Sequence, residues 1–207
     1  MQKILVEKDG HESVKYDSPD SLTYIRKSKL SDYEECKIVP HRHEDLEIVM
    51  ALSGEMLYTV GNKQYLLREK CAVAVNSMRW HSVEKSAADT DCEFIVVLIN
   101  PGVICTTKQL ENNYVLPLVS ENAPDVFMLD NETEWQKDLI SKLWEIYEAY
   151  AVHENMLQVT MLYFSIWQLL FFGGLPHKLR VLPPEPPTHK NGVRKAMKEM
   201  VMFIYDH

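Results

Sequence analysis

Two histidines and a glutamate stand close together in the sequence, at His41, His43 and Glu47. Side chains of the same parity point to the same face of a β-strand, so these three are expected to share one face. Two imidazoles and a carboxylate are suitable ligands for a divalent zinc, nickel, manganese or iron ion. A fourth ligand is available in His81, which follows an apolar, strand-like run at 71–75. The sequence therefore predicts a candidate metal site of three histidines and one glutamate.

The same face is also expected to open into a pocket for a small-molecule effector. The side chains that continue the parity of Glu47 are small, and this leaves room inside a barrel. Such a pocket combines apolar walls with a few placed polar groups. Besides His41, His43, Glu47 and His81, the candidate wall and rim residues are Tyr24, Tyr58, Arg79 and Trp80. Each of these four also has an ordinary interpretation, as a strand aromatic or a solvated turn residue.

The first 115 or so residues, which carry these side chains, have the pattern of many short strands. Residues 22–26 alternate with period two, and residues 46–52 form a continuous apolar run. Two further runs, 56–60 and 64–67, flank a turn at Gly61-Asn62-Lys63, which predicts a hairpin. β-Branched runs follow at 71–75 and 94–99. Short strands joined by turns at regular spacing predict a sandwich or barrel.

After residue 130 the periodicity becomes helical. Apolar residues from Glu134 onward recur at helical spacing, with Asn131 or Thr133 as the N-cap, and a second apolar helix begins at Met156. The short connection predicts an antiparallel helical hairpin that packs on the barrel and contacts a second subunit. The run 156–172 lies at the low edge of membrane-spanning length, and polar residues interrupt it. We interpret it as a core or dimer helix, and expect no membrane partner.

A proline-rich stretch within 175–190 predicts a stiff, extended linker. Residues 191–207 then form an amphipathic pattern that still continues at the last residue. This pattern is either the start of a further domain or a helix that folds back on the barrel. The predicted organisation is thus a barrel over 1–130, a helical hairpin over 131–174 and a linker over 175–190. Residues 191–207 are predicted to be the start of a further, DNA-binding domain.

Composition limits what the 207 residues do by themselves. The formal net charge is −8 and the pI is about 5.5, which argues against direct DNA binding by this chain. The four cysteines form no C-x-x-C motif, so we expect reduced, mostly buried thiols. The N-terminus has no apolar signal-peptide core. These features predict a cytoplasmic protein.

The spacing His41-x-His43, three residues, Glu47, six residues, Gly54 resembles the first cupin motif. The histidine that ends the second cupin motif is matched by His81, although the turn-forming residues of that motif are replaced. The resemblance implies a mainly β protein with α-helices. Its barrel would be of the cupin type, a double-stranded β-helix or jelly roll, followed by the antiparallel helical hairpin.

Within the cupins, the chain resembles the N-terminal domain of AraC-type transcription regulators. The resemblance rests on the strings at 41–49, 53–55, 60–66, 75–77, 81–82 and 113–118, in this order and spacing, together with the helical hairpin. It implies an effector-binding barrel without catalytic residues, a homodimer formed through the hairpin, and operator DNA bound by a C-terminal helix-turn-helix domain absent from these residues. In such domains the histidine and glutamate set holds either a metal or an organic effector without metal.

Two other functions compete with the sensor. A metal-dependent cupin enzyme, such as a dioxygenase or a sugar isomerase, would use the same four ligands to activate a substrate. A structural or partner-binding module would use the apolar hairpin, but it would leave the inward polar cluster without a role. The linker and the hairpin favour the sensor.

Overall fold

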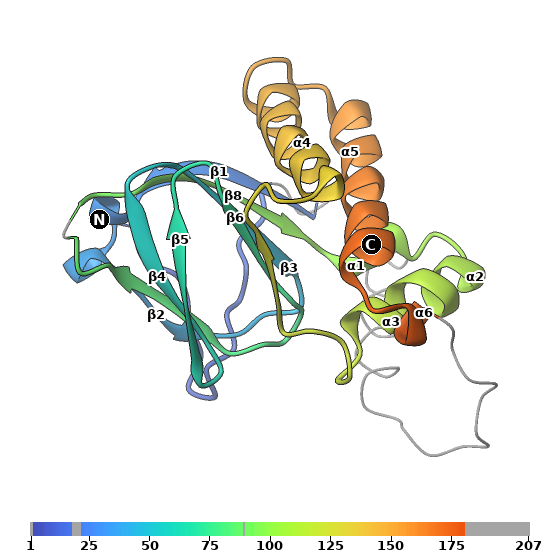
Figure 1. The fold of residues 1–207 in the computed structure, drawn as a ribbon, viewed down its shortest axis with the longest axis horizontal. Helices are drawn as coiled ribbons and strands as arrows, with labels where there is room; N and C mark the ends of the chain where they lie inside the picture. The colour runs from blue at the N-terminus through green and yellow to red at the C-terminus, as the bar shows by residue number, and fades with distance from the viewer. Residues whose placement is uncertain (1, 18–21, 89, 181–207) are drawn as a thin grey trace.

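The computed structural model describes residues 2–17, 22–88 and 90–180 (Figure 1). Most of the predicted linker and the predicted C-terminal helix lie outside these residues. Two antiparallel sheets face each other. The five-stranded sheet has the order β1 (Thr23–Lys29), β8 (Glu93–Ile99), β3 (Leu46–Ser53), β6 (Ala72–Val75) and β9 (Val126–Leu129). The four-stranded sheet has the order β2 (Lys37–His41), β7 (His81–Lys85), β4 (Glu55–Val60) and β5 (Lys63–Arg68).

The predicted hairpin is present as β4 and β5. Val60 pairs with Lys63, so Gly61 and Asn62 form a two-residue turn, and Gly61 has a φ of 58°. This left-handed conformation is one that glycine adopts without steric cost. Two short 3-10 turns, Leu30–Asp32 and Glu34–Cys36, lead from β1 into β2.

Strand β3 is buried on both faces, which accounts for its unbroken apolar sequence. Val49 and Ala51 point into the core between the two sheets. Ile48 and Met50 point the other way, into the core beneath the helices. Because successive side chains alternate between faces, one strand serves both cores.

The helices cover the outer face of the five-stranded sheet (Figure 1). α4 (Glu134–Ala151) begins at Thr133, which forms a capping box with Gln136, and α5 (Met156–Leu169) begins at Asn155. Leu139, Leu143 and Ile146 of α4 and Val159 and Ile166 of α5 join the core on that face. The fold class is therefore confirmed: a cupin-type antiparallel barrel followed by a helical hairpin.

A helical segment lies between β8 and β9, where the sequence analysis placed only barrel. It comprises α1 (Pro101–Ile104), α2 (Lys108–Leu110), a π-helical turn η3 (Glu111–Val115) and α3 (Leu116–Val119). Asn100 caps α1 by accepting a hydrogen bond from the amide of Gly102, and Pro101 occupies the first turn. The indole of Trp167 donates to the carbonyl of Tyr114 at 3.0 Å, which ties this segment to α5.

The residues after α5 differ in part from the predicted extended linker. α5 continues into a π-helical turn, η4 (Leu170–Gly174), and residues His177–Arg180 form a helical turn, α6. The side chain of Arg180 closes this turn by donating to the carbonyl of Leu175 at 2.9 Å. A backbone that folds back in this way is not extended over 177–180.

By length and composition alone, Met156–Gly174 would be able to cross a membrane. In the fold, however, α5 buries one side against the protein, including Val159, Tyr163 and Ile166. These contacts support its interpretation as a core helix.

Candidate metal centre

The four predicted ligands meet where the chain passes from one sheet to the other. His41 is the last residue of β2, in the four-stranded sheet, whereas Glu47 lies in β3 of the five-stranded sheet. The expectation that His41, His43 and Glu47 share one face of a single strand is therefore wrong. A bend around residues 43–45 separates the two strands, and it turns the three side chains toward one another across the sheets.

His81 follows the strand predicted at 71–75, but belongs to the next strand and to the other sheet. It begins β7, a strand of its own, and does not end the strand that holds residues 72–75. In β7 it is the cross-strand partner of His41. The two imidazole rings lie with their centroids 4.1 Å apart, which is the separation of directly opposed side chains on one sheet face.

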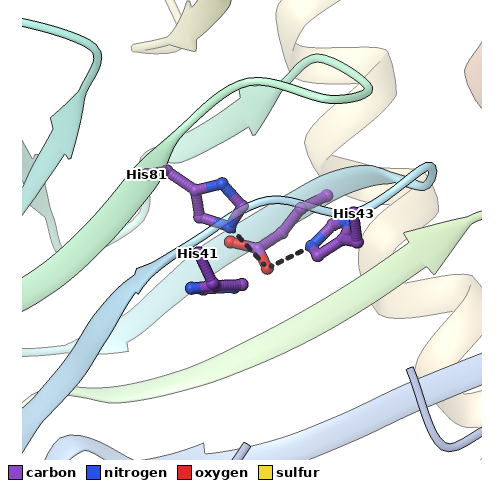
Figure 2. Close-up of side chains that lie close together, drawn as sticks. His41, His43 and His81 are labelled. Carbon is purple, nitrogen blue, oxygen red and sulfur yellow. Dashed lines mark ion pairs between the residues drawn. The ribbon is translucent and has the colours of Figure 1, made fainter. Parts of the chain in front are cut away.

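The distances between ligand atoms suit one shared ion. The Nε2 atoms of His43 and His81 each lie 3.6 Å from Oε2 of Glu47 (Figure 2). One ligand atom from each of the four residues lies within 4.8 Å of all the others, and all four residues are buried. Ligands at ~2.0–2.2 Å from a metal are separated from one another by about 3 to 3.6 Å. The cluster is thus close to the size of a coordination sphere.

Backbone contacts determine which ring nitrogen carries the hydrogen in the neutral form of each of the three histidines. The Nδ1 atoms of His41, His43 and His81 lie 2.8, 3.1 and 2.8 Å from the carbonyl oxygens of Val39, Asp45 and Arg79, respectively. Carbonyl oxygens only accept hydrogen bonds, so each Nδ1 carries the hydrogen. In the neutral ring the lone pair then lies on Nε2, and outer partners of this kind orient metal-ligating histidines.

Two of these Nε2 atoms, those of His43 and His81, are buried and make no hydrogen bond within the part of the chain that the structure describes. Buried polar atoms nearly always have a partner. Two Nε2 atoms that make no hydrogen bond and lie 3.6 Å from the same carboxylate oxygen are therefore the observation by which the residues fit a divalent metal.

Burial and neighbouring charges shift the pKa values of the groups in the cluster. Burial raises the pKa of Glu47, but the charge of His81 and the proximity of His43 outweigh it and hold this pKa well below its usual value. Burial lowers the pKa of His43, yet Glu47, with Asp45 and Glu12, raises it to about 9. Burial and the charge of His81 lower the pKa of His41 to about 3. At neutral pH the metal-free cluster thus contains an ionised Glu47, a protonated His43 and a neutral His41.

A small cavity of about 30 Å³ adjoins the cluster. His41, Glu47, Tyr24 and Tyr58 line it, so the structure brings four of the predicted pocket residues together. The hydroxyl of Tyr58 donates to Oε1 of Glu47 at 2.9 Å, which leaves Oε2 to face the histidines. The other walls are mainly apolar: Ile4, Tyr33, Ile38, Val49, Val83, Phe94, Val96 and Leu98. This volume has room for roughly two water molecules.

Arg79 and Trp80, which the sequence analysis also placed at the pocket, do not line this cavity. Arg79 pairs with Asp125, with Nε and Oδ1 2.5 Å apart, and donates to the carbonyl of Ser120. Trp80 is 43% exposed and lies over Gly10 and the guanidinium of Arg42. Both residues precede β7, so neither belongs to a strand that lines the cavity.

Two further carboxylates lie at the site that were not predicted from the sequence. Asp45 is buried beside His43, and its carboxylate accepts hydrogen bonds from the hydroxyl of Tyr16 at 2.7 and 2.9 Å. The position of Asp45 between the predicted ligands His43 and Glu47 is the sequence signal that places it near the site. Glu12 belongs to the N-terminal segment, and its Oε2 lies 3.2 Å from Nε2 of His41. No motif or spacing connects Glu12 with residues so distant in sequence.

Comparison with known proteins agrees with this geometry. A cupin domain model matches residues 33–98, a segment that contains all four predicted ligands. Residues 33–98 are therefore similar in sequence to cupin domains. The chain is also similar to the uncharacterized HTH-type transcriptional regulator YdeC of Bacillus subtilis (strain 168), with 23% identity over 137 residues. That alignment covers 65% of this chain and 46% of YdeC, so the chain spans about half the length of this relative.

Solved structures resemble parts of the barrel. One is a predicted oxalate decarboxylase from Thermotoga maritima, with 26% identity, coverage of 37% of this chain and 64% of that chain, and a TM-score of 0.33. Another is a Cupin 2 conserved barrel domain protein from Salinispora arenicola, with 13% identity, coverage of 42% and 70%, and a TM-score of 0.33. These likenesses are partial, and the fold assignment rests on the strand order of the chain itself and on the domain model.

Proposed function

We propose that this chain is the ligand-sensing and dimerisation domain of an AraC-type transcription regulator. The observation that carries the proposal is the similarity to an HTH-type regulator over 137 residues, about twice the length of the matched cupin segment at 33–98. Similarity of that length includes more than the barrel. The regulator's DNA-binding part would be a helix-turn-helix domain outside these 207 residues. The formal net charge of this chain is −8, and a negative net charge does not favour direct binding to DNA phosphates.

The ligand that the regulator senses would bind at the cluster of His41, His43, Glu47 and His81. A bound divalent metal would be held by these side chains and would supply a concentrated positive charge in a buried site. The small cavity beside it suits a metal with its waters or a small molecule, and a larger effector would require the walls to open. We propose zinc, nickel, manganese or iron as the candidate ions.

The signal would pass through β3, because this strand belongs to both cores. Glu47 faces the cluster, and the next residue, Ile48, packs beneath the helices. Occupancy of the site would favour one position of β3 and so one arrangement of the helical hairpin, which shifts a population between two states.

The hairpin would form the contact between two subunits of a cytoplasmic homodimer. Leu157 and Met161 of α5 are 73% and 63% exposed, and Phe172 of the following turn is half exposed. Their spacing places these apolar side chains along one side of the helix. An exposed apolar stripe of this kind is suited to a second copy of the same helix.

The proposal is tested with the full-length regulator that carries this chain. Genomic fragments bound by the purified protein are selected with and without a metal chelator, and again with a His43→Ala variant. We expect a defined operator whose binding changes on chelation, and the variant should behave as the chelated protein does. A full-length protein that selects no operator would refute the regulator function, and equal affinity under all three conditions would refute sensing through a bound metal.

A second function, a metal-dependent cupin enzyme, is favoured by one observation: among the described residues, the buried Nε2 atoms of His43 and His81 make no hydrogen bond. Such a site could leave coordination positions open for a substrate. Purified chain that contains stoichiometric redox metal and turns over a substrate, with turnover lost in His43→Ala, would establish this alternative.

A further inference from the structure

The N-terminal segment lies along the end of β2 that contributes His41 to the cluster of candidate metal ligands. The amide of Glu12 donates to the carbonyl of Arg42 at 2.9 Å, and the amide of Arg42 donates to the carbonyl of Gly10 at 3.0 Å. Gly10 has a φ of 80°, and a side chain there would overlap the ring of Trp80. These contacts hold Glu12 at a fixed place beside His41.

The side chain of Glu12 lies at the edge of the cluster, beside His41, and is turned away from solvent. Its Oε2 lies 3.2 Å from Nε2 of His41, and its side chain is 13% exposed. Nε2 is the nitrogen that would bind a metal, because Nδ1 of the same ring is engaged with the carbonyl of Val39. Glu12 also lines the cavity together with His41 and Glu47.

We infer that Glu12 is a fifth ligand of this site, which would then consist of three histidines and two carboxylates. The inference rests on the proposed metal binding. Neighbouring ligands in a six-coordinate site with bonds of ~2.1 Å lie about 3 Å apart, close to the observed 3.2 Å between Glu12 and His41. Structural zinc is almost always four-coordinate, whereas manganese accepts more oxygen ligands. Glu12 would therefore tune the site toward manganese or ferrous iron.

A different role for Glu12 predicts the opposite effect of its removal. If Glu12 only occupied Nε2 of His41 in the metal-free protein, it would compete with the ion, and its loss would tighten metal binding. If Glu12 is a ligand, its loss weakens binding. The direction of the change thus distinguishes the two roles without reference to any activity.

The test is a titration of the chelator-treated 207-residue chain with Mn²⁺ and Zn²⁺, each in competition with a chromophoric chelator. We compare the unmodified chain with Glu12→Gln and with a matched control, Glu7→Gln. Glu7 lies in the same N-terminal segment but is exposed and contacts Ser13. Loss of a group that merely orients a ligand typically costs ~10–100-fold in metal affinity. We expect Glu12→Gln to weaken Mn²⁺ binding by about 10-fold or more, to weaken Zn²⁺ binding less, and Glu7→Gln to change neither.

Unchanged or tighter Mn²⁺ binding by Glu12→Gln would overturn the inference while the proposed metal site stands. Failure of the unmodified chain to bind either metal would overturn the proposed site and the inference with it. Thermal unfolding of the metal-free variants shows whether they fold. Should Glu12→Gln not fold, Glu12→Asp keeps the charge but draws the carboxylate back from His41, and it should also weaken Mn²⁺ binding.

Discussion

At the scale of single residues, the site is governed by which nitrogen of each histidine is free. Three backbone carbonyls hold the Nδ1 atoms of His41, His43 and His81, so the Nε2 atoms face inward. None of these carbonyls can be removed by mutation, because they belong to the main chain. The orientation of the three histidine rings is therefore set by the backbone path.

The first prediction concerns the pH dependence of the metal-free chain. Burial lowers the pKa of His43, but Glu47 outweighs it and raises this pKa to about 9, above an unfolded value of ~6.5. The folded state then binds this proton more tightly, and the stabilisation is complete below pH ~6.5 and lost as pH rises through about 9. Burial raises the pKa of Glu12 to about 7, so that carboxyl titrates mostly at lower pH.

With chelator present, the free energy of unfolding should therefore fall between pH 7 and pH 9, by on the order of 1–3 kcal/mol. Urea denaturation at several pH values measures it. The Glu47→Gln variant lacks the negative charge that raises the pKa of His43, so its free energy of unfolding should fall much less over this pH range. An unfolding midpoint that stays constant over this range in the unmodified chain would contradict the assignment of the proton to His43.

The second prediction concerns the buried carboxylate of Asp45. The hydroxyl of Tyr16 donates to this carboxylate, at 2.7 and 2.9 Å from its two oxygens. The same hydroxyl accepts a hydrogen bond from the side-chain amide of Asn100 at 3.1 Å. Tyr16→Phe leaves a buried acceptor without its donor, which should cost about 1–3 kcal/mol of stability. Urea denaturation compares it with Tyr65→Phe, which removes a hydroxyl from a half-buried tyrosine in β5. Equal midpoints for the two variants would show that the Tyr16 hydrogen bond contributes nothing.

At the scale of elements, the sequence predicted those strands whose pattern is local. β3, β4, β5, β6 and β8 lie where the apolar runs indicated, because burial on one or both faces leaves a readable pattern. β2 was missed because its first four residues are only partly buried or exposed. The segment 101–119 was missed because its helices have three to five residues each, too few for a helical period to repeat.

The same contrast applies to the site. The four ligands were identified from a motif, whereas their convergence from two sheets required the bend at 43–45 to be known. Glu12 contacts His41 from the N-terminal segment, and contacts between residues so distant in sequence leave no trace in one sequence. Arg79 was misplaced because its pairing with Asp125, after α3, was not readable from residues near it.

The third prediction concerns the hairpin as a contact surface. Leu157→Glu and Met161→Glu place charges on the exposed side of α5 and should leave the fold intact. We expect the unmodified chain to sediment as a dimer and both variants to sediment as monomers, because a charge buried at an apolar interface is costly. Asn62→Glu, in the exposed turn between β4 and β5, is the control of equal charge change and should remain dimeric.

Sedimentation velocity over a range of protein concentrations measures this. A monomer in the unmodified chain at all concentrations, or dimers that persist in both α5 variants, would show that the hairpin does not form the contact.

At the scale of the whole molecule, the cluster joins the two sheets. His41 and His81 belong to the four-stranded sheet and Glu47 to the five-stranded one. A metal bound to all of them would link the halves of the barrel, and it would bind only the folded chain. Metal binding should therefore raise global stability and not merely local order.

The fourth prediction follows from that linkage. A metal at 100 times its dissociation constant stabilises the folded state by about 2.7 kcal/mol, which corresponds to roughly 5–10 °C in the thermal midpoint of a chain of this size. Calorimetry with metal and with chelator measures the shift. The double variant His41→Ala, His43→Ala should show no shift, and His153→Ala, at an exposed histidine, should respond as the unmodified chain does.

The burial of β3 on both faces has one more consequence, for the pairing of its backbone. A slip of a single residue relative to β6 and β8 would exchange the contents of the barrel with those beneath the helices. Glu47 would then enter the apolar core that Ile48 occupies beneath the helices, and Ile48 would take the place of Glu47 beside three imidazoles. Neither environment tolerates the exchange, since one would bury a charge among hydrocarbon and the other would remove a ligand. The register of β3 is thus fixed twice. On one face it is fixed by the burial of apolar side chains beneath the helices, and on the other by the position of Glu47 among the histidines.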